Sequence, residues 1–248
     1  MLVSIITTSY NQAKYLEQTI LSVVNQTYSN IEYIVMDAGS TDGSIDIIKK
    51  YDKHITYWQS KPDGGQVKAI NTAFKMAKGD LVAFVNSDDL LQPTAVEALL
   101  RAYDVNPDYS VYYGLCNMID TDGNEISKPK GSNIHYTDLL KIGMIPNIFQ
   151  PACFFNTKKL NREYFLDEKY PLAFDYELLL YLLKQGSFLF LYSHFATYRQ
   201  HNLSKSSTMK REHYLEKLKV QMLYSKKHWL LWKYRRLKFE IAIKLGKV

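Results

Sequence analysis

The first 90 residues alternate between short apolar runs rich in β-branched side chains and stretches in which apolar residues recur every three or four positions. Short runs of this kind predict strands, and the periodic stretches predict amphipathic helices. The predicted strands cover residues 2–7, 31–36, 55–59 and 81–85, and the predicted helices cover residues 13–25, 44–51 and 66–77. Because parallel strands need a crossover segment between them, this order predicts βα units on a mainly parallel sheet, an α/β fold.

The pattern changes beyond residue 90. Residues 111–119 and 125–127 are strand-like and flank Asp122-Gly123, a turn dipeptide typical of an antiparallel hairpin. The other predicted elements are helices at residues 94–103 and 176–185, the second closed by Gly186, and strands at residues 152–156 and 188–198. We therefore expect a smaller antiparallel part to follow the parallel one.

Length and cysteine content restrict the class of protein. With 248 residues, 46% of them hydrophobic, the chain can bury a core as one large domain or as one domain with an appendage. Cys116 and Cys153 lie among apolar neighbours, which favours reduced core residues over a disulfide or a metal site. A strand is predicted from residue 2, leaving no room for a signal peptide, and no apolar run approaches the ~18 residues that span a bilayer. We therefore expect a cytoplasmic protein.

The net charge of +6 is concentrated at the C-terminal end. Residues 209–248 hold twelve Lys or Arg against three Glu, a local +9 that leaves −3 for residues 1–208. This tail predicts basic amphipathic helices in which cations surround large apolar residues: Lys226, Lys227, Trp229, Leu230, Leu231, Trp232, Lys233, Tyr234, Arg235, Arg236 and Lys238. Either the tail lies on an anionic membrane surface at the inner face of the membrane, or its apolar residues pack on the rest of the chain. An acidic remainder without aromatic stacking platforms argues against a nucleic-acid partner.

Polar side chains follow three of the predicted strands. The first strand leads into Thr8-Ser9-Tyr10-Asn11, the second into Asp37, and the fourth into a segment that ends in two acids. Because the carboxyl ends of parallel strands meet at one edge of a sheet, we expect these residues to lie together at a ligand site.

The two acids are Asp88 and Asp89, which are adjacent in FVNSDDLLQP. Like charges this close raise the proton affinity of one carboxylate unless a cation neutralises them. Mg²⁺ or Mn²⁺ prefers carboxylate oxygens and keeps positions for water and phosphate, so the pair predicts a metal that binds a diphosphate. Capping of the helix predicted at residue 94 is the alternative, but both acids lie several residues too early.

Other nucleotide-binding schemes are not indicated. The chain has no Walker lysine loop and no G-x-G-x-x-G after its first strand. The segment GSTDGS at residues 39–44 is either a phosphate-binding loop or a glycine turn in which Asp42 or Ser44 caps the next helix.

Three segments together resemble a known family: SIITTSYNQAKYLEQTILSVVNQTYSNIEYIVMDAGSTDGS, PDGGQVKAINTAFKMAKGDLVAFVNSDDLLQP and FDYELLLYLL. They are similar to family 2 glycosyltransferases of the GT-A fold, and the resemblance covers residues 2–205. It implies a Rossmann-like sheet, mainly parallel with a smaller antiparallel part. The implied transferase domain is residues 1–208, with a nucleotide-binding half at 1–92, an acceptor half at 93–208 and the helical tail at 209–248.

The resemblance implies an inverting transfer of a sugar from a nucleotide-diphosphate donor, with UDP-sugar favoured, to an acceptor hydroxyl in bacterial surface polysaccharide or lipid-linked glycan assembly. Thr8, Tyr10 and Asn11 would line the nucleoside pocket and Asp37 would contact the base. In the second segment, Asp63 would border the donor and Lys68 would face its diphosphate. A solvated Lys68 is an equal alternative.

Asn86-Ser87-Asp88 occupies the position of the family's DXD motif. An amide replaces the commoner first Asp, so Asn86 would contact the nucleotide while Asp88, supported by Asp89, holds Mn²⁺ or Mg²⁺. The segment YRQHNLSKSS implies that Arg199 and His201 contact the diphosphate or the metal; the alternative for the histidine is an exposed loop position.

Inverting transfer needs a base for the acceptor hydroxyl. The resemblance places Asp175 in this role, with Glu177 as the second candidate, whereas the residues alone would favour acids that complement a helix N-terminus. Gln150 would shape the acceptor pocket. The alternative function is a non-catalytic sugar-nucleotide-binding or membrane scaffold protein, and Asn86 is the feature that favours it.

Overall fold

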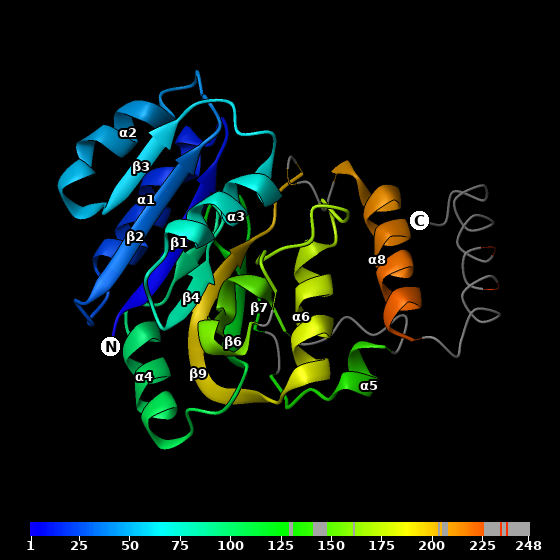
Figure 1. Cartoon of the computed structure of the whole chain (residues 1–248). Coiled ribbons are helices and arrows are strands. Elements are labelled where there is room, and N and C mark those ends of the chain that lie inside the picture. Colours follow the sequence, from blue (N-terminus) through cyan, green and yellow to red (C-terminus); the bar gives the residue numbers. More distant parts are fainter. Residues whose placement is uncertain are drawn as a thin grey trace.

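The computed structural model describes residues 1–128, 131–140, 148–160, 162–202, 204, 208–225, 234 and 237. Within them, one mixed sheet has the strand order β3-β2-β1-β4-β8-β6-β9-β5, with β7 paired to β6. Helices cover both faces of the sheet (Figure 1). The predicted α/β class is confirmed.

The first part of the chain forms the parallel side of the sheet. Its strands are β1 (Val3–Ser9), β2 (Ile31–Asp37), β3 (Tyr57–Ser60) and β4 (Leu81–Phe84), and its helices are α1 (Ala13–Val24), α2 (Ser44–Lys50), η1 (Asp52–His54) and α3 (Gln66–Met76). Strand β1 pairs in parallel with both β2 and β4, and β2 pairs in parallel with β3. The four strands and three main helices predicted here are all present.

The second part is more irregular. Its elements are β5 (Leu90–Leu91), α4 (Ala95–Val105), β6 (Val111–Ile119), β7 (Glu125–Ser127), α5 (Tyr136–Leu139), η2 (Gln150–Ala152), β8 (Cys153–Asn156), η3 (Thr157–Lys159), α6 (Phe174–Gln185), β9 (Phe188–Arg199) and α8 (Lys210–Tyr224). The β6–β7 hairpin was predicted, and β8 is antiparallel to β4 and β6. In contrast to the antiparallel prediction, β9 runs parallel to β6, because the path of the chain between two strands, and not their residues, sets their relative direction.

Two apolar clusters fill the two sides of the sheet. Successive side chains of a strand point to opposite faces, so Ile5 packs with Leu16 of α1 while Ile6 packs with Ile70 of α3. The Ile6 side also includes Leu178 of α6, so both parts of the chain share one core. Each fully buried aliphatic side chain contributes roughly 1.5–3 kcal/mol to the free energy of folding. Both cysteines are buried free thiols, as predicted.

Helix α8 belongs to this packed body. Leu218 and Val220 are buried, and Val220 lies in the same cluster as Leu178. For residues 210–224 the packing interpretation of the tail is therefore correct. The basic and aromatic set between residues 226 and 238 lies outside the described residues, apart from Tyr234, whose side chain is exposed. Among the described residues, no helix is both long and apolar enough to cross a bilayer.

Candidate active site

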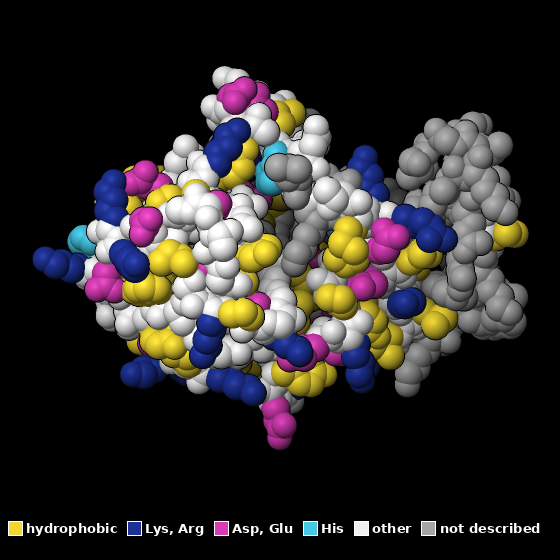
Figure 2. All heavy atoms as spheres, turned by 90° about the horizontal axis from the view of Figure 1, so that it is seen from above, with side chains coloured by type: hydrophobic (Ala, Val, Ile, Leu, Met, Phe, Trp, Pro, Cys, Tyr) yellow, Lys and Arg dark blue, Asp and Glu magenta, His cyan; other side chains and the backbone are white. Residues whose placement is uncertain are grey.

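The carboxyl ends of β1, β2 and β4 lie at one edge of the sheet, as the sequence predicted. Ser9 is paired with Asp37, and the amide of Val85 donates to the carbonyl of Ile6 just before β1 ends. Figure 2 looks onto this edge from above and shows a hollow near the middle of the face. The polar segments after these strands are therefore neighbours in space.

The loops after β1 and β2 are tied to each other. The Asn11 amide N–H donates to Ser40 Oγ at 2.8 Å, and Asn11 Oδ1 accepts from the Thr41 amide at 2.9 Å. Asn11 has a φ of 51°, the left-handed region that asparagine tolerates better than most residues. These contacts leave Thr8 partly buried and the Tyr10 ring 61% exposed, so Tyr10 is available to a flat ligand group.

Asp42 organises the GSTDGS segment. Its carboxylate accepts from the Ala13 amide at 2.8 Å, at the start of α1, and from the Ser44 amide at 3.1 Å and hydroxyl at 2.6 Å. Although burial pushes the pKa of Asp42 upward, the hydrogen bonds from Ser44 and Ala13 outweigh it and the pKa is lowered. The geometry shows a glycine turn in which Gly43 is the N-cap residue of α2 and Asp42 accepts from the first amide of that helix.

Asp37 is completely buried beneath the same loop. Its Oδ2 accepts from the Gly39 and Ser40 amides at 3.0 and 2.8 Å and from Ser60 Oγ at 2.6 Å, while its Oδ1 accepts from Ser40 Oγ at 2.6 Å. A nucleotide base would have to displace these hydrogen-bond donors to reach the Asp37 carboxylate. Asp37 shapes the loop, and its expected contact with the base stays a prediction.

The PDGG segment leads into α3. Asp63 Oδ1 accepts from the Gly65 amide at 2.8 Å, and both glycines have left-handed φ values, +78° at Gly64 and +112° at Gly65. A side chain at Gly64 would contact Lys68, whose exposed chain lies over this turn. Asp63 therefore shapes the turn. The exposed side chain of Lys68 remains accessible to a nucleotide-sugar donor.

The segment after β4 is held by a chain of side-chain contacts. Gln66 Nε2 donates to Asn86 Oδ1 at 2.8 Å, and Asn86 Nδ2 donates to Asp89 Oδ2 at 3.1 Å. Asp89 is completely buried, its Oδ1 accepts from the Arg199 amide at 3.0 Å, and neighbouring Ser87 is also buried. Burial and then the charge of Asp88 raise the pKa of Asp89 well above its usual range. Asp89 is thus an internal anchor beside Asp88, and its expected place among the metal ligands stays a prediction.

Asp88 meets His201 at this edge. His201 Nε2 lies 2.8 Å from Asp88 Oδ2 although the two residues are 113 positions apart. The Asp88 side chain is 17% exposed and the His201 side chain 3%, with the imidazole ring 5.4 Å from the ring of Tyr15. The interpretation of His201 as an exposed loop residue is wrong. Two of the three side chains that sequence reasoning assigned to a metal therefore lie together.

Arg199 is buried beside this pair. Its Nε donates to the Asp88 carbonyl at 3.1 Å, its Nη2 to Gln18 Oε1 at 2.7 Å and its Nη1 to the Asp120 carbonyl at 3.3 Å. Its guanidinium carbon lies 4.7 Å from the centre of the Tyr15 ring. The guanidinium group is engaged within the protein and holds the Asp88 backbone, and the expected diphosphate contact of Arg199 stays a prediction.

Asp88 and His201 fit a site in which a divalent cation is bound partly by protein side chains and partly by a bound ligand. In the described parts of the chain, no group of three or more His, Cys, Asp or Glu could hold a metal. Asp88 and His201 would supply two ligands, and Mg²⁺ or Mn²⁺ commonly completes its coordination with water and phosphate oxygens.

Asp175 reaches the same region from the acceptor half. It lies in the first turn of α6, where its Oδ1 accepts from the Tyr176 amide at 2.7 Å. The preceding residue, Phe174, has its ring 6.0 Å from Phe84, the last residue of β4. Gln150, expected in the acceptor pocket, donates instead to the Phe84 carbonyl. The start of α6 therefore packs on the end of β4, the strand that precedes the segment with Asp88.

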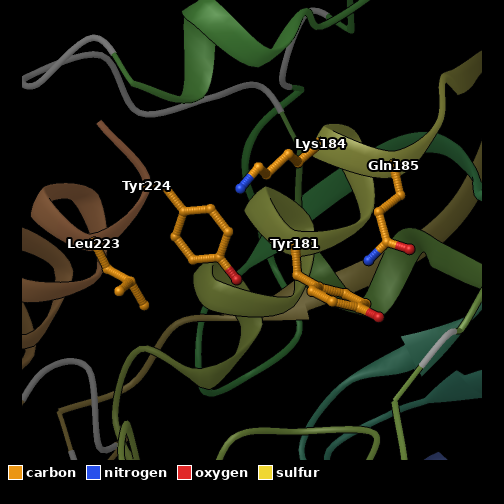
Figure 3. Close-up of a pocket in the computed structure, with 5 residues that line it drawn as sticks. All are labelled: Tyr181, Lys184, Gln185, Leu223 and Tyr224. Carbon is orange, nitrogen blue, oxygen red and sulfur yellow. The ribbon is translucent and has the colours of Figure 1, made fainter. Parts of the chain in front are cut away.

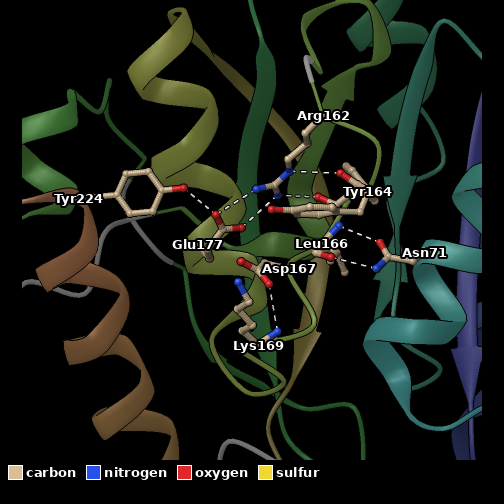
Figure 4. A network of polar contacts seen from close by, with 9 residues as sticks. Asn71, Arg162, Tyr164, Leu166, Asp167, Lys169, Glu177 and Tyr224 are labelled. Atoms are coloured by element: carbon tan, nitrogen blue, oxygen red, sulfur yellow. Dashed lines mark hydrogen bonds and ion pairs between the residues drawn. The ribbon is translucent and has the colours of Figure 1, made fainter.

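The second base candidate has a structural role. Glu177 is buried and forms a bidentate ion pair with Arg162 at 3.0 Å for each bond, and the Tyr224 hydroxyl donates to it at 2.6 Å (Figure 4). Arg162 also donates to the carbonyls of Tyr164 and Phe165. A carboxylate with these partners is not available as a base, so the assignment of Glu177 is corrected.

Sequence reasoning did not find several supporting residues. Arg162, Tyr15, Gln18 and Gln66 carry no local motif, and only their distant partners reveal their roles. An open hollow between α6 and α8, lined by Tyr181, Lys184, Gln185, Leu223 and Tyr224, lies towards the far end of α6 from Asp175 (Figure 3). It is not part of this site.

Comparisons with known proteins agree with this geometry. The sequence model of "Glycosyl transferase family 2" matches residues 4–206. A chondroitin synthase of Escherichia coli is 31% identical over 189 residues, 75% of this chain and 27% of that protein. The chain spans only 19–27% of the length of the chondroitin and hyaluronan synthases that it matches.

Two solved structures show the same fold. S. aureus TarS in complex with UDP-GlcNAc has a TM-score of 0.67 and 19% identity, covering 92% of this chain and 73% of that chain. The mannosyltransferase PcManGT from Pyrobaculum calidifontis, in complex with GDP-Man and Mn²⁺, has a TM-score of 0.63 and 16% identity, covering 87% and 62%. Because the family model covers residues 4–206, the chain belongs to the family "Glycosyl transferase family 2", and its structure has the GT-A fold.

Proposed function

We propose that the protein transfers a sugar from a nucleoside-diphosphate donor, with UDP-sugar favoured, to an acceptor hydroxyl with inversion at the anomeric carbon. Its product would be part of a bacterial surface polysaccharide or a lipid-linked glycan. Support comes from the family, from relatives named as chondroitin synthases, and from structural neighbours bound to UDP-GlcNAc and GDP-Man.

The observation that carries the proposal is the Asp88–His201 pair at the carboxyl edge of the parallel strands. Asp88 and His201 would hold Mg²⁺ or Mn²⁺, which supplies positive charge to the departing diphosphate when bound. The exposed ring of Tyr10 would stack on the nucleoside, and Lys68 would approach the diphosphate. Asn86, Asp89 and Arg199 keep the Asp88 backbone in place.

Asp175 is the proposed base. It takes the proton of the acceptor hydroxyl while that oxygen forms a bond to the anomeric carbon and the bond from that carbon to the diphosphate oxygen breaks. Attack from the face opposite the leaving group inverts the configuration. The packing of Phe174 on Phe84 brings the start of α6 to the donor strand.

The non-catalytic alternative rested on Asn86. In the structure the Asn86 amide accepts from Gln66 and donates to Asp89, so one amide serves both neighbours. Asn86 therefore has a structural reason to be an amide, which supports the transferase proposal over the non-catalytic alternative.

A thermal-shift experiment tests the proposal. UDP with Mn²⁺ is expected to raise the melting temperature of the full chain, as binding to the folded state must, and Asp88→Ala is expected to abolish the rise. Asp108→Ala, at a carboxylate whose side chain is 94% exposed, is the matched control and should keep it. The absence of a shift with UDP, GDP and their sugar conjugates, with or without Mn²⁺, would contradict the proposal.

A further inference from the structure

Helix α8 lies beyond the part of the chain that matches the family, which ends at residue 206. It nevertheless runs beside α6, the helix that carries Asp175 (Figure 1). Three of its side chains make polar contacts with the acceptor half: Glu216, Gln221 and Tyr224. These contacts raise the question of what α8 contributes to the site.

Glu216 contacts the segment from which α6 begins. Its Oε2 accepts from the amide N–H of Leu172 at 2.8 Å and of Ala173 at 3.1 Å. Ala173 is completely buried and is the N-cap residue of α6, where it makes no capping hydrogen bond through its own side chain. A carboxylate at this place satisfies backbone donors that would otherwise lack partners, and its charge is favourable at a helix N-terminus.

The position of Glu216 is itself fixed from the far end of α8. Gln221 donates to the Leu140 carbonyl at 2.6 Å, the Tyr224 hydroxyl donates to Glu177 at 2.6 Å, and Tyr136 donates to the Tyr224 carbonyl at 2.9 Å. Glu177 lies in the same first turns of α6 as Asp175, and Arg162 holds it from the other side (Figure 4). Helix α8 is thus anchored near both Asp175 and Glu177.

His213 supports this placement. It lies one turn before Glu216 on the same face of α8. Burial lowers the pKa of His213, the charge of Lys217 lowers it further, and the charge of Asp175 opposes both. This agrees with the contacts of Glu216, which join this turn of α8 to the start of α6.

We propose that Glu216 is a positioning residue for Asp175. By holding the Leu172 and Ala173 amides it fixes the turn from which the Asp175 side chain emerges, two residues later, so α8 is part of the catalytic unit although the family match ends before it. The inference rests on the proposed role of Asp175 as the base.

The test compares Glu216→Ala, Glu216→Gln and the control Glu212→Ala, an exposed acid one turn earlier on α8, in the full chain. Because a displacement of about 1 Å at a reacting group can cost on the order of 10²-fold in rate, Glu216→Ala is expected to lower kcat about ten- to hundredfold. The donor KM and the UDP–Mn²⁺ thermal shift should stay unchanged. Glu216→Gln keeps an acceptor oxygen and should recover most of kcat, and Glu212→Ala should match the unchanged protein.

Hydrogen exchange gives a readout that is independent of turnover. The amides of Leu172 and Ala173 should exchange faster in Glu216→Ala than in the unchanged protein, because their acceptor is gone. An unchanged kcat in Glu216→Ala while Asp175→Asn is inactive would overturn the inference and leave the proposed function intact. Parallel losses in kcat, donor affinity and melting temperature would also overturn it, since they indicate general damage. A wild-type protein that transfers no sugar would instead contradict the proposed function, and with it the role of Asp175.

Discussion

The nucleotide-binding half (residues 1–92), called the donor half below, and the later part of the chain form their parts of the candidate site through different kinds of contact. In the donor half, polar residues at strand ends bind the neighbouring loop: Asn11 binds Ser40, 29 positions away, and Asp37 binds Ser40 and Ser60, 3 and 23 positions away. In the acceptor half and the tail, the contacts join more distant segments. Glu216 binds the amide of Leu172 across 44 positions, and His201 meets Asp88 across 113.

This difference separates two kinds of residue. In the nucleotide-binding half, the carboxylates of Asp37 and Asp42 accept hydrogen bonds from neighbouring backbone amides. These two residues therefore maintain the shape of the loops. The later part of the chain supplies His201 and the proposed base Asp175, and their places depend on long-range packing. Substitutions should therefore affect shape and stability in the first group, and turnover or global stability in the second.

The largest effect is expected for Asp175→Asn. The amide cannot accept the hydroxyl proton, so transfer should fall by roughly 10²- to 10⁴-fold, the usual contribution of a general base. Donor binding should persist, because the donor half is untouched. Steady-state transfer and a UDP–Mn²⁺ titration measure the two properties, and turnover close to that of the unchanged protein would exclude Asp175 as the base.

Arg162→Ala should have the largest effect on stability. It leaves the Glu177 carboxylate buried without its cation, and removal of one partner of a buried ion pair costs about 3–5 kcal/mol of unfolding free energy. Urea denaturation followed by circular dichroism measures the loss. Lys184→Ala, at an exposed position on α6, serves as the control, and equal stabilities of the two variants would refute the structural role of the pair.

Asp37→Ala tests the donor half. The substitution removes the charged acceptor of the Gly39 and Ser40 amides and of the Ser60 hydroxyl. This should lower the free energy of unfolding by about 1.5–3 kcal/mol. UDP should bind more weakly because the loop that carries Ser40 also holds Asn11. If nucleotide affinity fell while stability stayed constant, Asp37 would be a direct base contact after all, as the family resemblance implied.

The smallest effect is expected for Lys68→Ala. An exposed side chain away from buried contacts changes the free energy of unfolding by no more than about 0.5 kcal/mol. An exposed cation contributes at most about 1 kcal/mol to a charged contact, so UDP affinity should fall by about fivefold or less. Calorimetric titration with UDP distinguishes this from no change at all, which would leave Lys68 as a solvated residue.

Local patterns predicted most of the fold. The elements from β1 to β4 were found within one to two residues, because alternating apolar runs and helical periods report burial directly. Strand β5, with two residues, and the short helix α5 were missed, since neither is long enough to show a period. The parallel pairing of β6 with β9 was also missed, because it depends on the route of the chain.

For the site, the sequence predicted the edge at which the polar residues gather, but it did not show which of their side chains are buried. Asp89 and Arg199 were expected at the metal or the diphosphate, and both are buried as anchors. A motif shows which residue types follow a strand, but it does not show which side chains turn inward. Arg162 and Glu216 had no motif at all, and their partners lie 15 and 44 positions away.

By itself, the sequence determined the α/β class, the parallel half, the polar edge and, through its motifs, the family, because each depends on residue order over short distances. The tertiary structure decided which carboxylates remain accessible, that His201 lies beside Asp88, and that the basic tail begins as a helix packed on α6. These outcomes follow from burial and from hydrogen bonds between distant segments, since a polar group withdrawn from water must find a partner wherever the fold supplies one.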